Sequence, residues 1–336
     1  MKKNYFVEVI KFLSAILVIF SHSFALSMNI KDPLANLTNG IISFGAIGVS
    51  VFFTISGYYI AKSITKKGSN NYIKKRLTRL LPSIVIVVLM CTFLIGPFIT
   101  NLSIKDYFFN KQTYLYLLNS IFIPIHNLPG VFTKNIYGKT VNGALWTMSI
   151  QFMCYIYILI AFKIRLLNNK NKYLISSIAL GIIAYIICNY IKMNTLLSAI
   201  RPFLVFIISN YLYLNNYKGK KEFLLLSILL LTIAIILKNE IVLNISLIIL
   251  IPIIIIYLCN NINLKKIDKR IERIIICSYE LYLVGFPIQQ LVVHLYGGKM
   301  NTYLNFLISA TISIILSLII NTLSTSFITK YKKDSI

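Results

Sequence analysis

The chain has 336 residues, of which 57% are hydrophobic and 13% are charged, and its formal net charge is +25. A soluble core cannot bury that much apolar surface, and several uncharged runs approach or exceed the ~20 residues that cross a bilayer. The composition therefore excludes an ordinary soluble globular protein and predicts an all-α, polytopic integral membrane helix bundle.

Ten membrane-spanning helices are predicted, within a single transmembrane domain over residues 1–336 and with no appended soluble domain. Their ranges are 6–28, 39–61, 80–99, 145–164, 173–191, 197–214, 223–238, 241–259, 273–295 and 303–328. The first span also has features of a signal peptide, because Lys2 and Lys3 precede it and Ser23-Phe-Ala25 resembles a weak cleavage site. The nine spans that follow favour a retained helix.

Basic residues are distributed unevenly between the two sides of this predicted topology. If the N-terminus is cytoplasmic, 24 of the 34 lysines and arginines fall on the cytoplasmic side and eight on the other side. This bias follows the positive-inside rule, so both termini are expected in the cytoplasm of a multi-pass cell membrane protein. The basic excess is a topology signal and does not indicate nucleic-acid binding.

Cysteine and histidine spacing gives no sign of a metal centre. The five cysteines form no CxxC pair and are expected to be small apolar fillers, and the three histidines are scattered. The sequence contains neither a Walker loop nor a glycine-rich dinucleotide fingerprint, which disfavours an ATP-driven pump. No metal and no permanently bound cofactor are expected.

The first predicted span, "IKFLSAILVIFSHS", carries a lysine and a histidine in an apolar run. Eleven helical positions separate Lys11 from His22, which places them on nearly the same face about 16 Å apart, and Glu8 joins this face. An ionisable group within a membrane costs about 2.5–3.5 kcal/mol and usually faces a cavity or the bundle interior. Lys11 could extend to the headgroups, but His22 lies deeper. His22 is therefore either a satisfied structural histidine or a functional group.

The second informative stretch is "GVSVFFTISGYYI", which begins at Gly48 and includes Ser56 and Gly57. Its small residues permit close helix approach. A loop with seven cations follows, and Arg76 and Arg79 share one helix face, where they could bind phosphates in bidentate fashion. Lys74 and Lys75 add positive charge, and Pro82 suits the first turn of the next span. Alternatively, these cations have no binding role and only mark the cytoplasmic end of a membrane span, as the positive-inside rule predicts.

Polar residues also enter the later spans. In "VNGALWTMSIQF", Trp146 marks the outer boundary, and Ser149 and Gln151 need partners in an apolar setting. Arg201 lies near the outer end of its span and could extend outward instead of having a function. In "CSYELYLVGFPI", Tyr279 and Glu280 lie near the cytoplasmic side.

Residues 100–144 form the only long loop predicted to face outward. We expect this loop to help form the mouth for an acceptor substrate. Its aromatic residues could stack on sugar rings or, as is slightly favoured, lie at the membrane interface. They are Tyr107, Phe108, Phe109, Tyr114 and Tyr116.

These stretches, in this order, resemble the acyltransferase family 3 membrane proteins, which O-acylate cell-surface polysaccharides. Lys11 and His22 are similar to the family's Arg-x10-His pair, and "FFTISGYYI" to its Phe-Phe-x-x-Ser-Gly-Tyr/Phe helix. Arg76 and Arg79 fit its Arg-x-x-Arg pattern, and two further segments match "NGALWTMSIQF" and "SYELYLVGFPI". Three positions depart from the family pattern: Lys11 replaces arginine, Gln151 replaces a common glutamate and Gly285 replaces a common histidine.

The resemblance implies an O-acyltransferase that moves an acyl group from cytoplasmic acyl-CoA to a hydroxyl of an envelope glycan. Acetyl is the acyl group that the resemblance implies by default. His22 would be the general base and Lys11 would assist it, while Arg76, Arg79 and Lys75 would bind the donor phosphates. An acyl-enzyme on His22 or Ser21 is a less favoured route. The residues implied to line the tunnel or the acceptor site are Glu8, Ser56, Trp146, Ser149, Gln151, Arg201 and Tyr279.

Two other classes of function remain open at this stage. A polar cavity between ten helices would also suit a transporter or flippase of an acyl group or glycan. The changes at Gln151 and Gly285 would also suit an inactive relative that acts as an assembly partner. Membrane lipid, acyl-CoA and a glycan acceptor are the expected partners, together with polysaccharide-synthesis machinery; nucleic acid is not expected, and the oligomeric state is open.

Overall fold

The computed structural model describes residues 4–334, and within that range it leaves out the side chains of 194–197 and of the residues from 330 onward. The described part is helical, with no strand and only an isolated bridge between Asn127 and Thr140. The all-α prediction is therefore confirmed. Lys2 and Lys3, on which the signal-peptide alternative depends, lie outside the described residues.

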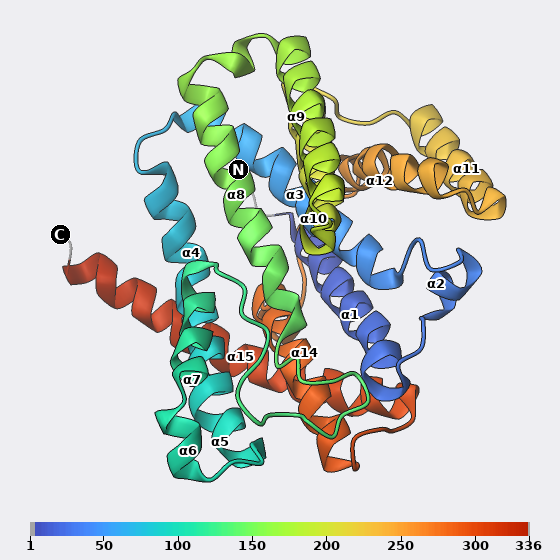
Figure 1. Cartoon of the computed structure of the whole chain (residues 1–336). Coiled ribbons are helices and arrows are strands. Elements are labelled where there is room, and N and C mark those ends of the chain that lie inside the picture. Colours follow the sequence, from blue (N-terminus) through green and yellow to red (C-terminus); the bar gives the residue numbers. More distant parts are fainter. Residues whose placement is uncertain (1–3, 335–336) are drawn as a thin grey trace. The chain divides into compact units, whose positions relative to one another are not determined.

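The helices follow one another along the chain with short connections, apart from the segment that precedes α8 (Figure 1). They are α1 (Tyr5–Met28), α2 (Pro33–Leu37), α3 (Phe44–Lys67), α4 (Tyr72–Met90), the π-turn η1 (Cys91–Ile95), α5 (Gly96–Ile99), α6 (Ile104–Phe109), α7 (Lys111–Leu115), the 3-10 turns η2 (Tyr116–Ile121) and η3 (Gly143–Leu145), α8 (Trp146–Lys163), η4 (Leu166–Asn168), α9 (Lys170–Tyr190), α10 (Asn194–Leu214), α11 (Lys221–Leu237), α12 (Glu240–Asn261), α13 (Lys269–Ile275), α14 (Ser278–Leu295) and α15 (Thr302–Asp334).

All ten predicted spans coincide with helices, but fewer of them meet the criteria for crossing a membrane. In the described part of the chain, seven helical segments are long and apolar enough, or eight if α13 and α14 form one span bent by 59°. Helix α11 has 17 residues, and the side chains of α10 (Asn194–Leu214) are described only from Ser198 onward. The chain is thus a membrane protein with multiple apolar helices.

Two boundaries differ from the prediction because local structure extends or shortens the helix. Helix α3 begins at Phe44 and not at 39, since Asn39 and Gly40 adopt positive φ after α2 and Ser43 caps the new helix. Helix α4 begins at Tyr72, so Pro82 lies in its interior and not in its first turn. The basic residues that precede Pro82 are good helix formers, and they extend the helix ahead of the apolar span.

The chain divides into two compact units, each made of segments that are discontinuous in sequence. Unit 1 comprises Met1–Ile10, Pro33–Ile73 and Ile150–Lys266. Unit 2 comprises Lys11–Asp32, Lys74–Ser149 and Ile267–Ile336.

In unit 1, α3 packs against α10 and α12, α10 packs against α9, and α11 packs against α12. Helices α3 and α10 approach closely at Gly57, where an added Cβ would lie 2.7 Å from the Phe206 carbonyl oxygen and 2.9 Å from Ser209 Cβ. The prediction that small residues of this stretch allow close helix packing is confirmed at Gly57.

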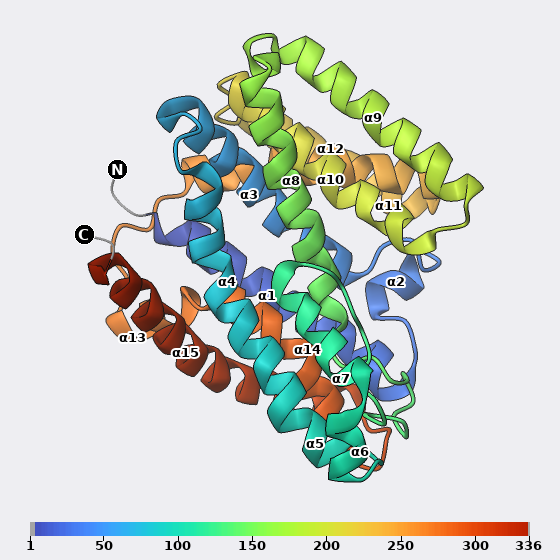
Figure 2. The same ribbon diagram turned by 60° about the vertical axis from the view of Figure 1, so that its left-hand side comes forward.

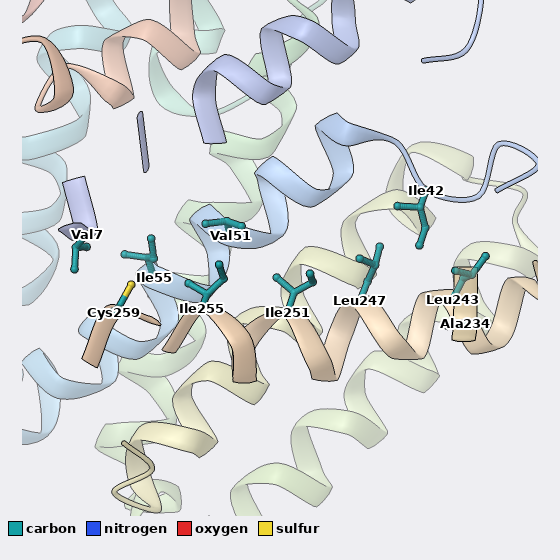
Figure 3. Packing of buried hydrophobic residues seen from close by; sticks show 10 residues of the cluster. All are labelled: Val7, Ile42, Val51, Ile55, Ala234, Leu243, Leu247, Ile251, Ile255 and Cys259. Atoms are coloured by element: carbon teal, nitrogen blue, oxygen red, sulfur yellow. The ribbon is translucent and has the colours of Figure 1, made fainter. Parts of the chain in front are cut away.

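An apolar cluster lies along α12 in unit 1 (Figure 3). Leu243, Leu247, Ile251 and Ile255 recur at intervals of four residues, so they form one stripe on α12. Side chains of α3 pack against this stripe. The buried members are Val7, Ile42, Val51, Ile55, Ala234, Leu243, Leu247, Ile251, Ile255 and Cys259.

In unit 2, α14 packs against α15, and the segment after α4 folds into the short helices α5, α6 and α7 (Figure 2). The Tyr107 hydroxyl donates a hydrogen bond of 2.8 Å to the Thr92 carbonyl in the π-turn. An added Cβ on Gly96 would lie 1.9 Å from the Tyr107 hydroxyl oxygen, so this contact requires glycine at position 96. The π-turn and Gly96 thereby anchor the start of segment 100–144.

Candidate functional site

Lys11 and His22 both lie on α1, which is one uninterrupted helix, and both are half-buried. From Lys11 onward α1 belongs to unit 2. The His22 ring meets the edge of the Phe286 ring from α14, with centroids 5.2 Å apart and an interplanar angle of 78°. The helix that the sequence predicts for these two residues is confirmed, and its partner at His22 is an aromatic side chain.

Asp32 is an acidic neighbour of His22 that the sequence analysis did not identify. The Ser21 hydroxyl donates a hydrogen bond of 2.5 Å to Asp32 Oδ2, and Asp32 is only 3% exposed. Its negative charge also lies close enough to act on the His22 imidazole. Asp32 stands ten residues after His22, beyond the end of α1, so no helical spacing could have connected the two residues.

Helix α14 approaches α1 closely one turn before His22. A Cβ on Gly285 would lie 2.6 Å from Ile19 Cγ1, so a larger residue at 285 would require the buried Ile19 to move. One turn further along α14, Gln289 is fully buried, and its Nε2 donates a hydrogen bond of 2.8 Å to the Ile19 carbonyl. Glycine at position 285 thus allows α14 to pack closely against Ile19 of α1.

The predicted donor-binding cations lie in the first turns of α4, in unit 2. Lys75 and Arg79 are exposed and Arg76 is half-buried. Just beyond them, the Tyr279 hydroxyl donates to the Leu80 carbonyl at 3.2 Å, and the Ser83 hydroxyl donates to Glu280 Oε1 at 2.8 Å. Hydrogen bonds with the start of α14 therefore fix the part of α4 that follows Arg79.

Four of the predicted lining residues belong to unit 1. Gln151 is buried, and its Nε2 donates a hydrogen bond of 3.0 Å to the Ser56 hydroxyl, so these two predicted residues are brought together. Glu8 and Arg201 are half-buried. Arg201 Nη1 has no hydrogen-bond partner among the described residues.

Trp146 and Ser149 lie at the start of α8, in unit 2. Trp146 is half-buried. The Ser149 hydroxyl donates a hydrogen bond of 2.6 Å to the carbonyl of Phe122, so its contact is with the preceding segment.

The aromatic residues of segment 100–144 divide into buried and exposed groups. Tyr107 and Tyr116 are fully buried, and burial raises the pKa of each hydroxyl. These two rings cannot stack on a sugar, whereas Phe109 and Tyr114 are exposed. His126 is half-buried in the same segment; burial lowers its pKa, and a hydrogen bond to the Asn142 backbone opposes that shift.

Metal-ligating residue types do not gather in the described part of the chain. Among residues 4–334, no three His, Cys, Asp or Glu side chains are placed to hold one ion, and the five cysteines are unpaired and buried. The chemistry that this arrangement can support is acid–base chemistry at His22, beside the buried Asp32 carboxylate.

Comparison with known proteins gives a family and two relatives. A family model described as an acyltransferase domain matches residues 4–324. An "O-acetyl transferase" of Shigella phage Sf6 is 32% identical over 157 residues, which cover 46% of this chain and 44% of that protein. "Nodulation protein 10" of Rhizobium leguminosarum bv. viciae is 25% identical over 153 residues, or 44% of this chain and 41% of that protein. The matches thus span less than half the length of either relative, and no solved structure matches the chain.

Proposed function

The chain belongs to the acyltransferase family whose model covers nearly its whole length, and we propose that it is a membrane O-acyltransferase that transfers an acyl group from acyl-CoA to a sugar hydroxyl of a cell-envelope polysaccharide. The observation that carries this proposal is the placement of His22 on α1, beside the buried Asp32 and against Phe286. Acetyl-CoA is the proposed donor, in keeping with the name of the phage relative.

In this proposal His22 acts as the general base. Its imidazole nitrogen takes the proton of the acceptor hydroxyl while the hydroxyl oxygen attacks the thioester carbonyl carbon. The carbon–sulfur bond then breaks, and the CoA thiolate receives the proton from the imidazolium. The products are an acyl ester on the sugar and free CoA, so atoms and charge balance without a further reactant.

Asp32 supports this role because its carboxylate lies close to His22 and is itself held by the Ser21 hydroxyl. A carboxylate near an imidazole stabilises the cation that forms when the imidazole accepts a proton. Ser21 is only 8% exposed, so we favour direct transfer over an acyl-enzyme on this residue.

The donor is proposed to bind where α4 presents its cations. Arg76, Arg79 and Lys75 would hold the anionic phosphates of CoA, and Lys11, on the same helix as His22, would lie along the path of the pantetheine arm. Lys11 provides a point charge in place of a planar guanidinium, so its binding to a phosphate would be weaker.

The proposed topology has ten spans and both termini in the cytoplasm of a cell-membrane protein. The distribution of basic residues supports the orientation, and α10 and α11 would be the two further spans. With this orientation the α4 cations face the compartment in which acyl-CoA is made.

The test is the O-acetyl content of surface polysaccharide from cells that express the wild type, His22→Ala, His294→Ala or no protein. We expect acetylation with the wild type and with His294→Ala, and a loss of at least about a hundredfold with His22→Ala, since general-base catalysis contributes about 10²–10⁴-fold. Membrane levels of all variants are measured in parallel.

Each contrary result has a distinct meaning. An O-acetyl content that is the same for His22→Ala and the wild type would exclude His22 as the base. A wild type that adds no acetyl but moves labelled glycan across the membrane would identify a transporter, and one that does neither would identify an inactive relative.

A further inference from the structure

An exposed tyrosine is linked to His22 by ring contacts. The ring of Tyr137 meets the Phe286 ring edge-on, with centroids 5.9 Å apart and an interplanar angle of 72°. Phe286 in turn meets His22. Tyr137 is 41% exposed whereas Phe286 is 3% exposed, so the series runs from the surface of unit 2 to the imidazole.

The backbone on either side of Tyr137 is held firmly. The Ile136 amide donates to the Gly298 carbonyl at 2.8 Å, and Gln290 Nε2 donates to the carbonyls of Gly138 and Thr140 at 3.3 and 2.7 Å. Gln290 is itself fixed, because Asn135 Nδ2 donates to its Oε1 at 2.8 Å. Residues 135–140 are therefore tied to α14 and to the turn that follows it.

Phe286 is confined on a second side by backbone. A Cβ added to Gly143 would lie 2.6 Å from Phe286 Cε2, so glycine at 143 allows the ring to lie against the chain just before α8. Tyr137, Gly143 and His22 thus all lie against the ring of Phe286, and this buried ring connects the exposed Tyr137 ring with the imidazole.

We propose that Tyr137 is the platform on which a sugar ring of the acceptor polysaccharide stacks, which brings one of its hydroxyls toward His22. A tyrosine that is exposed yet held by its neighbours offers a rigid amphipathic surface at little cost in conformational entropy. A pyranose ring has an apolar C–H face that matches this surface. Its edge carries the hydroxyls from which His22 would take a proton. This inference rests on the proposed function, since it needs His22 to act on an acceptor hydroxyl.

The alternative role for an exposed tyrosine in a membrane protein is anchoring at the bilayer interface. That role would not connect Tyr137 with acceptor binding, and it would be shared by Tyr114 of α7, which is 49% exposed in the same unit. Tyr114→Ala is therefore the matched control for Tyr137→Ala.

The experiment uses the full-length protein in membranes, with labelled acetyl-CoA as donor. The acceptor is polysaccharide extracted from the expressing cells and freed of its O-acetyl groups by mild alkali. Acceptor and donor concentrations are varied separately for the wild type, Tyr137→Ala, Tyr137→Phe and Tyr114→Ala.

We expect Tyr137→Ala to raise the KM for polysaccharide about tenfold, as the loss of one aromatic contact predicts, and to leave the KM for acetyl-CoA unchanged. Tyr137→Phe keeps the ring and should stay within about twofold of the wild type, as should Tyr114→Ala. An unchanged KM for polysaccharide in Tyr137→Ala, or an equal rise for both substrates, would overturn the platform while leaving the proposed function intact. A wild type without transfer would overturn both.

Discussion

The two units of this membrane protein differ in the contacts that stabilise each of them internally. Unit 1 packs α3, α10 and α12 through an apolar stripe and through close backbone approach at Gly57. Unit 2 contains a larger set of buried polar side chains that bond one helix or loop to another, which include Asp32, Asn135, Asn142, Glu280, Gln289 and Asn305.

This difference matters because polar groups in a membrane protein are costly unless they are paired. Bonds such as Asn142 Nδ2 to the Leu283 carbonyl and Asn305 Nδ2 to the Ser27 hydroxyl fix the position of a helix more strictly than apolar contact does. We infer that unit 1 serves mainly as a scaffold, whereas unit 2 holds the side chains that carry out the chemistry. Three substitutions test this contrast.

The largest effect is expected on the stability of unit 1. Leu247→Ala removes a fully buried side chain from the apolar stripe and should destabilise the protein by about 2–5 kcal/mol. The activity of the protein that remains folded should not change. Thermal unfolding and activity per folded protein, both in detergent, provide the measurements.

Leu229→Ala on α11 is the control, because Leu229 is 57% exposed in the same unit. A loss of specific activity in Leu247→Ala, out of proportion to the loss of folded protein, would mean that unit 1 takes part in the chemistry.

The next effect is expected on catalysis in unit 2. Asp32→Asn keeps the size of the side chain but removes the charge beside His22, and it should lower kcat about 10–100-fold with little change in the KM for acetyl-CoA. Steady-state transfer from labelled acetyl-CoA measures both constants.

Asp106→Asn is the matched control, since Asp106 is an exposed carboxylate that accepts a hydrogen bond from Ser103 in the same unit. If the two variants behave alike, Asp32 has no special relation to His22. A lower melting temperature with unchanged kcat would leave Asp32 with a structural role only.

The smallest effect is expected from the polar bond that ties α14 to α1. Gln289→Leu removes the hydrogen bond to the Ile19 carbonyl and should cost about 1 kcal/mol of stability. Transfer should also fall severalfold, because α14 carries Phe286 against His22. Thermal unfolding and transfer assays measure the two effects.

Gln112→Leu serves as the comparison, since Gln112 Nε2 donates to the Asn127 carbonyl at 3.3 Å in an exposed setting. If both variants lost the same small amount of stability and activity, the Gln289 hydrogen bond would stabilise the fold without positioning His22.

The sequence by itself determined the class of protein and the elements that carry the candidate site. Long apolar runs can satisfy their backbone groups in a bilayer only as helices, so the all-α membrane architecture followed from composition. Helical periodicity likewise put Lys11 and His22 on one helix and Arg76 and Arg79 on another, because these relations extend over a few turns of continuous chain.

Only the tertiary structure decided which side chains meet from separate elements. Asp32 is bonded to Ser21 from a loop, Phe286 contacts His22 from α14, and Gln151 is bonded to Ser56. Tyr107 and Tyr116 were expected in an outward loop but are buried. These outcomes depend on the close approach of α14 to α1 at Gly285 and on the folding of segment 100–144 against η1, and contacts of that kind leave no periodic pattern in the sequence.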